Sequence, residues 1–368
     1  MKRLLVAFGT RPEAIKLAPL ILGGRQRGAE FEIVTLATGQ HREMLEQALS
    51  VFGITPMVDL ALMRPNQDLV TLTAEALTGV SKVIARVQPD WVVVQGDTTT
   101  ALAATLAAFY ARVPVAHVEA GLRTGELASP WPEEANRQLI TRLAALHAAP
   151  TALAKANLLR EGIAESAIVV TGNTVVDAVA WIAQSSDFAG PLPAELAAPG
   201  RDLVLITCHR REHFGEGLRA ICAALCALAA AHPELQFLFP VHLNPEVQQA
   251  VHAALSGIAN LNLVPPVDYR TSLQLLSRAR LVLTDSGGIQ EEAPCFGVPA
   301  VVMREYTERR EGVDQGFAVL TGPSTDAIIR AAEAFLADAG VRERLRSRPN
   351  PYGDGAAAAR ILDALARR

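Results

Sequence analysis

The sequence contains few lysines and few aromatic residues, and neither sign of charge is in large excess. Of its 34 Lys and Arg residues only four are Lys, and 38 Asp and Glu residues leave a net charge of -4 across 368 residues. A chain without a basic excess has no electrostatic reason to bind nucleic acid or an anionic membrane surface, and we expect neither as a partner.

Long hydrophobic runs are also missing. The longest wholly apolar run, Ala220–Ala231, is well short of the roughly 20 residues that a membrane-spanning helix needs. The opening residues, MKRLLVAFGTRP, run directly into an apparent strand and turn, without the apolar segment and small-residue cleavage site of a signal peptide. We therefore expect a cytoplasmic protein.

Cysteine is scarce and its spacing carries no metal-site pattern. The four residues are Cys208, Cys222, Cys226 and Cys295, and no two of them form a C-x-x-C motif. Free thiols, most of them buried, are the usual state of such residues in a reducing compartment. We expect no metal site.

Half of the residues are hydrophobic, and the length suggests two domains. Short apolar runs alternate with longer segments rich in Ala and Leu, as in parallel sheets whose strands are buried on both faces. The pattern predicts an α/β protein with two doubly wound, Rossmann-like domains. The predicted strands are Leu4–Phe8, Phe31–Leu36, Trp91–Gln95, Val113–Val118, Leu146–Ala149, Ile168–Thr171, Leu203–Thr207, Gln236–Pro240, Leu261–Val264, Leu281–Thr284, Ala300–Met303 and Phe317–Leu320.

A stretch rich in Pro, Gly and Ser divides the predicted strands into two groups. We place the domain linker at residues 185–200, between an N-terminal domain of residues 1–184 and a C-terminal domain of residues 201–354. Residues 355–368 read as a helix that could pack back on the first domain. Ligands of doubly wound sheets bind beyond the carboxyl ends of the strands, so we expect a cleft between the domains.

Polar residues gather directly after the predicted strands, where a parallel sheet brings them to one edge. Helix starts and turns explain Ser, Thr, Asp and Gly at such positions, but they do not explain the recurrence of His and Arg. This bias favours an anionic ligand. The segments are Gly9–Glu13, Thr38–Arg42, Gly96–Thr98, Glu119–Gly121, Gly172–Asn173, His209–Glu212, His242 and Asp285–Gly288.

The first of these segments predicts a helix that starts near an anion. Thr10 and Glu13 have the spacing of a capping box, which marks a helix start. Arg11 then lies at the positive end of the helix dipole, where a cation is unfavourable unless an anion joins it. Lys16, about one turn further on, could serve the same anion or lie as a solvated surface lysine.

The glycine-rich segment Ser286–Gly288 resembles a phosphate cradle without the lysine of a P-loop. Glu292 could contact ribose hydroxyls or could complement the helix dipole. Residues Gly215–Ala220 fit G-x-G-x-x-A, but a charged segment separates them from the preceding strand and no acidic residue closes the next one. This argues against a nicotinamide cofactor, and we expect none of any kind.

Several carboxylates follow strands in the first half of the chain. Asp97 could cap a helix, whereas Glu119 stands at a strand end with no helix start nearby. Glu133 and Glu134 follow a Pro-rich loop and fit a first helical turn. Carboxylates that lie close together push their pKa values apart, which provides an acid and a base near neutral pH.

Together these segments resemble the non-hydrolysing UDP-N-acetylglucosamine 2-epimerases, in one order and almost end to end. The matching strings are Phe8–Leu20, Thr38–Leu45, Gln95–Thr100, His117–Gly125, Ser129–Arg137, Thr171–Ala178, His209–Glu212, Pro240–Pro245, Thr284–Pro294, Thr307–Arg309 and Asn350–Gly355. The resemblance implies a two-domain glycosyltransferase-B-like fold and a homodimer. It also implies interconversion of UDP-GlcNAc and UDP-ManNAc, through elimination of UDP to a 2-acetamidoglucal and its re-addition, to supply ManNAc for cell-surface polysaccharide.

The resemblance also assigns roles to individual residues. It implies that an acid/base set is formed by Asp97, Glu119 and Glu133, and that His209 lies near the pyrophosphate. It implies that UDP is held by Arg11, Lys16, Ser286, Gly287, Gly288, Glu292 and Arg309. It implies a regulatory site for a second UDP-GlcNAc at Gln40, Arg211 and His242.

Three other functions remain open at this point. One is a hydrolysing epimerase that releases ManNAc and UDP, and another is a retaining glycosyltransferase of the same architecture. The third is a catalytically silent sensor of nucleotide sugars.

Overall fold

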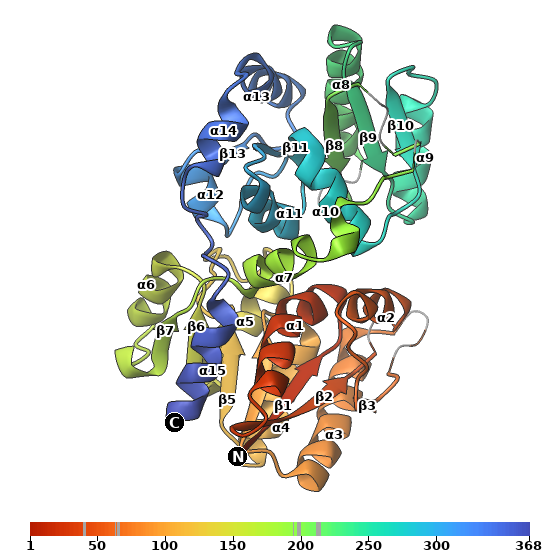
Figure 1. Cartoon of the computed structure of the whole chain (residues 1–368). Helices are drawn as coiled ribbons and strands as arrows, with labels where there is room; N and C mark the ends of the chain where they lie inside the picture. Colours follow the sequence, from red (N-terminus) through yellow and green to blue (C-terminus); the bar gives the residue numbers. More distant parts are fainter. Residues whose placement is uncertain (40–41, 63, 65–66, 194, 197–199, 211–214) are drawn as a thin grey trace. The chain divides into compact units, whose positions relative to one another are not determined.

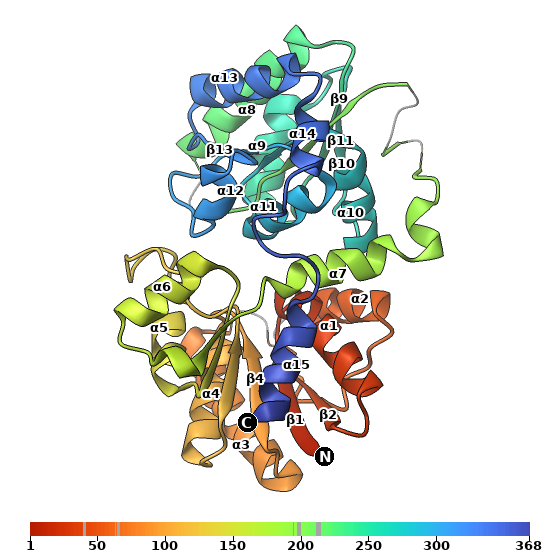
Figure 2. The same ribbon diagram turned by 60° about the vertical axis from the view of Figure 1, so that its left-hand side comes forward.

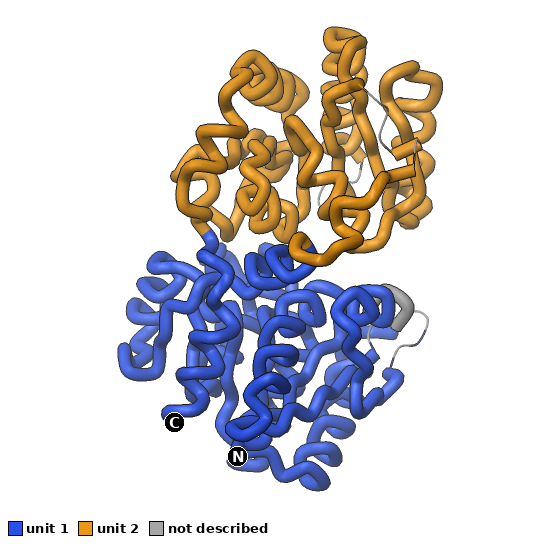
Figure 3. Tube along the Cα trace, viewed as in Figure 1, with its two compact units in different colours: residues 1–182, 352–368 blue, residues 183–351 orange. Residues whose placement is uncertain are grey.

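The computed structural model describes the whole chain except residues 40–41, 63, 65–66, 194, 197–199 and 211–214. The chain divides into two compact units, which Figure 3 shows in blue and orange. Unit 1 comprises residues 1–182 and 352–368, and unit 2 comprises residues 183–351. The stretch predicted as the linker belongs to unit 2, where the Gln274 amide donates to the Phe188 carbonyl oxygen at 2.8 Å.

Within its described residues, unit 1 is built on a seven-stranded sheet in the order β3-β2-β1-β4-β5-β6-β7, with every pairing parallel (Figure 1). Strand β1 lies inside the sheet between β2 and β4, and its last five residues are fully buried because helices cover both faces. The strands are β1 (Lys2–Phe8), β2 (Phe31–Ala37), β3 (Val58–Asp59), β4 (Trp91–Gln95), β5 (Val115–Val118), β6 (Leu146–Ala149) and β7 (Ile168–Val170).

The crossover helices of unit 1 follow these strands in turn. They are α1 (Arg11–Gln26), α2 (Arg42–Val51), α3 (Leu69–Val87), α4 (Thr99–Tyr110), α5 (Glu133–Leu143), α6 (Ala152–Arg160) and α7 (Thr174–Ala183), with a 3-10 turn at Glu165–Ala167.

The C-terminal helix α15 (Ala357–Arg367) also belongs to unit 1 and lies beside α1 in both ribbon views (Figure 2). Gly23 and Gly24 of α1 make room for the Leu362 side chain. The Asp177 carboxylate of α7 accepts the first backbone N–H groups of α15, from Ala357 at 3.2 Å and Ala358 at 2.9 Å. An acceptor at this end of a helix satisfies donors that would otherwise be unpaired.

Unit 2 has a six-stranded parallel sheet among its described residues, in the order β10-β9-β8-β11-β12-β13. The strands are β8 (Leu203–Thr207), β9 (Gln236–Pro240), β10 (Leu261–Val264), β11 (Ala279–Thr284), β12 (Ala300–Val302) and β13 (Ala318–Leu320). The helices are α8 (Glu216–Ala231), α9 (Pro245–Leu255), α10 (Tyr269–Arg278), α11 (Gly287–Glu292), α12 (Arg310–Asp314), α13 (Thr325–Ala337) and α14 (Val341–Arg346), with 3-10 turns at Ser186–Ala189 and Ala293–Phe296.

The prediction of two doubly wound α/β domains is confirmed, and every predicted strand is present to within two residues at either end. Strand β3 was not predicted, because two residues paired at a sheet edge leave no apolar run to recognise. In both sheets the strand order reverses beside the first strand, between β1 and β4 in unit 1 and between β8 and β11 in unit 2. Loops at such switch points diverge and leave room for a ligand.

Candidate active site

The loop after β1 is anchored by a buried carboxylate. Glu13, 1% exposed, accepts the backbone N–H groups of Gly9 at 3.0 Å and Thr10 at 2.8 Å on one oxygen. Its other oxygen accepts the hydroxyl of Thr98, in the loop after β4, at 2.7 Å. Burial raises the pKa of Glu13 despite these bonds. The carboxylate therefore joins the two loops of the switch point in unit 1.

The two predicted cations of α1 have different surroundings. Arg11 is exposed at the helix N-terminus, and its guanidinium group forms no hydrogen bond or ion pair with the other residues that the structure describes. Lys16 is buried, and its ammonium group pairs with the Glu119 carboxylate. Arg11 is thus available for an anion, whereas Lys16 contacts a predicted catalytic acid instead of lying in solvent.

Glu119 follows β5 and has a strained backbone. Its φ is +64°, in the left-handed region that residues other than Gly seldom adopt. The side chain is held by Lys16 and by the Asn173 amide, which donates to Oε2 at 2.8 Å. Such strain persists only where the surroundings impose it, and it concentrates at functional sites. The fold thus directs this carboxylate toward Lys16 and Asn173.

Asp97 follows β4, the neighbour of β5, and the paired ends of these strands are Gln95 and Val118. Its carboxylate pairs with the Arg137 guanidinium of α5, and its backbone carbonyl accepts the Asn136 amide at 2.8 Å. Asp97 and Glu119 therefore stand at adjacent strand ends, each beside a buried cation.

Glu133 and Glu134, the first residues of α5, have different surroundings. Glu134 is fully buried and binds Arg137 at 3.2 Å and the Thr124 backbone N–H at 3.1 Å, so it holds the loop before α5. Glu133 is half-buried and lies four residues before Arg137, on the same face of the helix. That spacing brings Glu133 to the side of α5 that reaches Asp97.

In unit 2, His209 follows β8 and Asp285 follows β11, on either side of the second switch point. Asp285 is fully buried, and its Oδ1 lies 3.2 Å from His209 Nδ1. Burial raises the pKa of Asp285, but the imidazole and the backbone N–H groups of His209 and Arg210 outweigh it and bring the pKa to about 2. The carboxylate is therefore ionised at neutral pH.

The predicted regulatory residues are described only in part, because Gln40 and Arg211 lie outside the described residues. His242 follows β9, and its ring stacks on that of His209, with 5.9 Å between centroids and 23° between planes. The structure thus brings together one residue predicted for regulation and one predicted for catalysis.

The predicted nucleotide-binding residues of unit 2 surround the start of α11. Ser286 occupies the N-cap position, and a side chain at Gly287 would collide with the Arg309 guanidinium, 2.8 Å away. Arg309 is buried and pairs with Glu291, at 2.8 Å, and with Glu308. Glu292 Oε1 accepts the Tyr269 hydroxyl at 3.0 Å. Arg309 therefore lies beneath the glycine segment with its charge neutralised by carboxylates.

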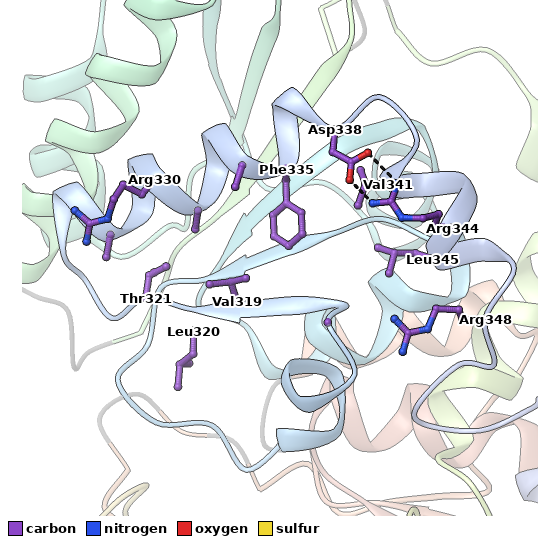
Figure 4. Close-up of a pocket in the computed structure, with 14 residues that line it drawn as sticks. Val319, Leu320, Thr321, Arg330, Phe335, Asp338, Val341, Arg344, Leu345 and Arg348 are labelled. Atoms are coloured by element: carbon purple, nitrogen blue, oxygen red, sulfur yellow. Dashed lines mark hydrogen bonds and ion pairs between the residues drawn. The ribbon is translucent and has the colours of Figure 1, made fainter.

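A cavity of about 660 Å³ lies elsewhere in unit 2, between β13, α13 and α14 (Figure 4). Its walls combine the apolar side chains of Val319, Phe335 and Leu345 with the guanidinium groups of Arg330 and Arg348. It contains none of the residues predicted for catalysis or nucleotide binding.

Across the described part of the chain, no cluster of His, Cys, Asp and Glu has the grouping of a metal site. Nor is any helix there long and apolar enough to cross a bilayer.

Sequence reasoning missed the partners of the predicted residues. Arg137, Asn173 and Asp285 all stand in the segments that carry the family resemblance, but their contacts cross from one element to another. The available signal was their position in the chain: Asn173 and Asp285 follow strand ends, and Arg137 lies one helical turn beyond Glu133.

Two doubly wound domains with polar clusters at both switch points define a two-domain α/β protein of the glycosyltransferase-B-like class. A profile described as UDP-N-acetylglucosamine 2-epimerase matches residues 25–366. The chain belongs to this family.

Relatives match over nearly their whole length. The UDP-N-acetylglucosamine 2-epimerase of Yersinia pestis is 50% identical over 369 residues, covering 99% of this chain and 98% of that protein. The Escherichia coli K12 enzyme of the same name is 47% identical, with the same coverage. The crystal structure of the UDP-GlcNAc 2-epimerase from Neisseria meningitidis bound to UDP-GlcNAc has a TM-score of 0.91 and 41% identity, with both chains covered completely. The Methanocaldococcus jannaschii enzyme in complex with UDP-GlcNAc and UDP has a TM-score of 0.86 and 32% identity, again over both complete chains.

Proposed function

We propose that this protein interconverts UDP-GlcNAc and UDP-ManNAc without hydrolysing them. The observation that carries the proposal is the pair of carboxylates at adjacent strand ends, Asp97 beside Arg137 and Glu119 beside Lys16. Family membership supports the choice of substrate, since a relative with 41% identity is described bound to UDP-GlcNAc.

The proposed reaction begins with an elimination. The C2–H bond and the C1–O bond of the sugar break, C1=C2 forms, a base takes the proton, and UDP leaves. Departure of the C1 oxygen builds oxocarbenium character, which carboxylates stabilise as they do in glycosidases. Re-addition of UDP to C1, with a proton delivered to the other face of C2, completes the epimerisation and regenerates every group. We assign the proton transfers at C2 to Asp97, Glu119 and Glu133.

The leaving pyrophosphate requires fixed positive charge and N–H donors. We assign this task to Arg11 and to the Ser286, Gly287 and Gly288 segment. We assign Lys16 instead to Glu119, with which its ammonium group pairs. The exposed and unpaired state of Arg11 among the described residues supports its role. We further propose that His209 gives a proton to the pyrophosphate, that Glu292 contacts ribose, and that Arg309 supports the glycine segment and the phosphate from below.

The remaining proposals follow from family membership. They are a homodimer, a cytoplasmic location, a role in polysaccharide biosynthesis, and activation by a second UDP-GlcNAc at Gln40, Arg211 and His242. Size-exclusion chromatography with light scattering tests the dimer, and a sigmoidal dependence of rate on UDP-GlcNAc concentration tests activation.

Proton NMR of UDP-GlcNAc with the purified protein in D₂O tests the reaction itself. We expect UDP-ManNAc that carries deuterium at C2. At equilibrium the UDP should still be covalently attached to the sugar. Accumulation of free ManNAc and UDP would instead indicate a hydrolysing epimerase. Saturable binding without exchange at C2 would indicate a sensor, and reaction only after an acceptor is added would indicate a transferase.

The carboxylate assignment predicts the behaviour of three variants. Asp97→Asn, Glu119→Gln and Glu133→Gln should each lower turnover by about 10²-fold or more, the scale of general acid–base catalysis, while UDP affinity stays near that of the wild type. Steady-state kinetics and calorimetric titration with UDP measure the two effects. Wild-type turnover in all three variants would contradict the assignment.

A further inference from the structure

The surroundings of Asp285 give it a defined relation to His209. Its Oδ2 accepts two backbone N–H groups, from His209 at 2.9 Å and from Arg210 at 2.8 Å. Its Oδ1 lies 3.2 Å from His209 Nδ1. A fully buried carboxylate needs such donors to remain charged, and these donors come from the loop that carries the imidazole.

The two backbone donors fix the orientation of the carboxylate. Because they both bind Oδ2, Oδ1 is left to face the ring at ion-pair distance, and it is a buried oxygen with no hydrogen-bond partner among the described residues. A carboxylate held ionised accepts only, so it favours a proton on the imidazole nitrogen opposite it. In the neutral ring the lone pair is then on Nε2, and in the cation Nε2 is the second donor.

The other neighbours of the pair agree with this arrangement. The His242 ring stacks on His209 and limits its tilt, and His242 Nδ1 accepts the Asn244 backbone N–H at 3.1 Å. The Cys208 thiol also lies beside Asp285, and burial, with the carboxylate adding to it, raises the pKa of this thiol well above its usual value. The thiol therefore stays neutral and adds no charge beside the carboxylate. The His209 side chain is 43% exposed, which leaves it accessible to a ligand.

We propose that Asp285 is a positioning residue for His209, holding the proton on Nδ1 so that Nε2 is the atom offered to the substrate. The inference rests on the proposed role of His209 in proton transfer to the leaving pyrophosphate. Asp285 does not touch substrate in this proposal. It fixes which ring nitrogen gives and takes the proton, and it stabilises the imidazolium when that form is present.

The Asp285→Asn variant separates this role from simple support of the loop. The two backbone N–H groups still require an oxygen acceptor, so the amide oxygen takes the place of Oδ2 and the NH₂ group faces His209 Nδ1. The neutral ring must then be protonated on Nε2. We expect kcat to fall by about 10²-fold or more, the scale of general acid–base catalysis, with KM changed less than threefold.

Three measurements decide the proposal. In protein labelled with ¹⁵N-histidine, long-range ¹⁵N–¹H spectra should show His209 protonated on Nδ1 in the wild type and on Nε2 in Asp285→Asn, with His209→Asn used for assignment. In the His209→Ala background, Asp285→Asn should lower kcat no further. The control Asp202→Asn, at an exposed surface pair with Arg280 in the same unit, should leave kcat unchanged.

Two results would overturn the proposal: a wild-type His209 protonated on Nε2, or an equal further loss of kcat in the His209→Ala background. The wild-type spectrum does not depend on the variant folding. It is also independent of the reaction. A protein without epimerase activity would contradict the proposed function, but the spectrum would still show which nitrogen of His209 is protonated.

Discussion

At the residue scale, the contact between Lys16 and Glu119 gives Lys16 a function different from the one that its place in the sequence suggests. A lysine one turn after Arg11 fits an anion site, yet in the fold it is buried against Glu119. Its charge holds an ionised carboxylate where the backbone φ of +64° directs it. Lys16 should therefore influence proton transfer more than nucleotide binding.

This difference predicts opposite effects for two substitutions in α1. Lys16→Met should lower kcat by about 10²-fold, because Glu119 loses its partner, and should change the Kd for UDP less than twofold. Arg11→Ala, the matched control, should raise the Kd for UDP, because it removes an exposed cation. Calorimetric titration with UDP and steady-state kinetics measure both.

Stability provides a second test of the same pair. Leaving one buried charge alone costs about 3–5 kcal/mol, so Lys16→Met should also lower the free energy of unfolding. The double variant Lys16→Met/Glu119→Gln should recover much of that stability but none of the turnover. If Lys16→Met altered only UDP affinity, the assignment of Lys16 to Glu119 would be wrong.

At the element scale, the packing of α6 sets the path of the loop that carries Glu119. Gly121 has a φ of +92°, and a side chain there would collide with the backbone carbonyl of Ala154 and lie 3.0 Å from Leu158 Cγ. The Asn157 amide of the same helix donates to the Gly121 carbonyl oxygen at 2.8 Å. The loop therefore needs a residue without Cβ at this position.

We expect Gly121→Ala to destabilise the protein by about 2–4 kcal/mol, from overpacking added to the cost of a left-handed backbone. Gly162→Ala is the matched control, since its φ is +81° but its Cβ would point into open space. It should cost only about 1–2 kcal/mol. Urea unfolding compares the two, and equal losses would show that contact with α6 does not constrain the loop.

The sequence predicts the elements better than it predicts the contacts between them. Apolar runs identify strands such as β4 and β8 with their observed bounds, because burial on both faces is a local property of a parallel strand. The pairing of Arg137 with Asp97, or of Lys16 with Glu119, depends on how each helix is rotated against the sheet. No local pattern records that rotation, so the candidate residues could be named while their partners could not.

At the scale of the whole molecule, the two units carry titratable groups that respond to acid in opposite ways. His117 and His147 are buried neighbours on β5 and β6 in unit 1, and burial is the main cause that lowers their pKa values to about 3 and about 4. In unit 2, burial alone would lower the pKa of His232, but Glu333 and Glu234 raise it. Asp285 has a pKa of about 2, so its contribution to stability is lost only below the ordinary aspartate range.

The signs of these shifts predict that unit 1 unfolds first in acid. Below pH ~6.5, His117 and His147 bind protons in the unfolded chain but not in the folded chain. Each histidine therefore lowers the free energy of unfolding by about 1.4 kcal/mol per pH unit. Over two pH units this sums to about 5 kcal/mol, comparable with the stability of a whole domain. Glu13 and Asp177, whose pKa values burial raises, oppose the loss as they take up protons. His232, with its raised pKa, contributes a stabilisation of unit 2 that is already complete below pH ~6.5 and is not lost over the same descent in pH.

Tryptophan fluorescence can follow unit 1 separately, because Trp91, Trp131 and Trp181 all lie in it. On lowering the pH from 7, the fluorescence transition should therefore precede the loss of far-UV circular dichroism, to which both units contribute. His147→Gln removes one of the two groups that bind a proton only in the unfolded chain, so it should move the fluorescence midpoint to lower pH. His252→Gln, at an exposed position on α9 of unit 2, should leave that midpoint in place. A single transition seen equally by both probes, with the same midpoint in all three proteins, would mean that the buried histidines do not govern acid stability.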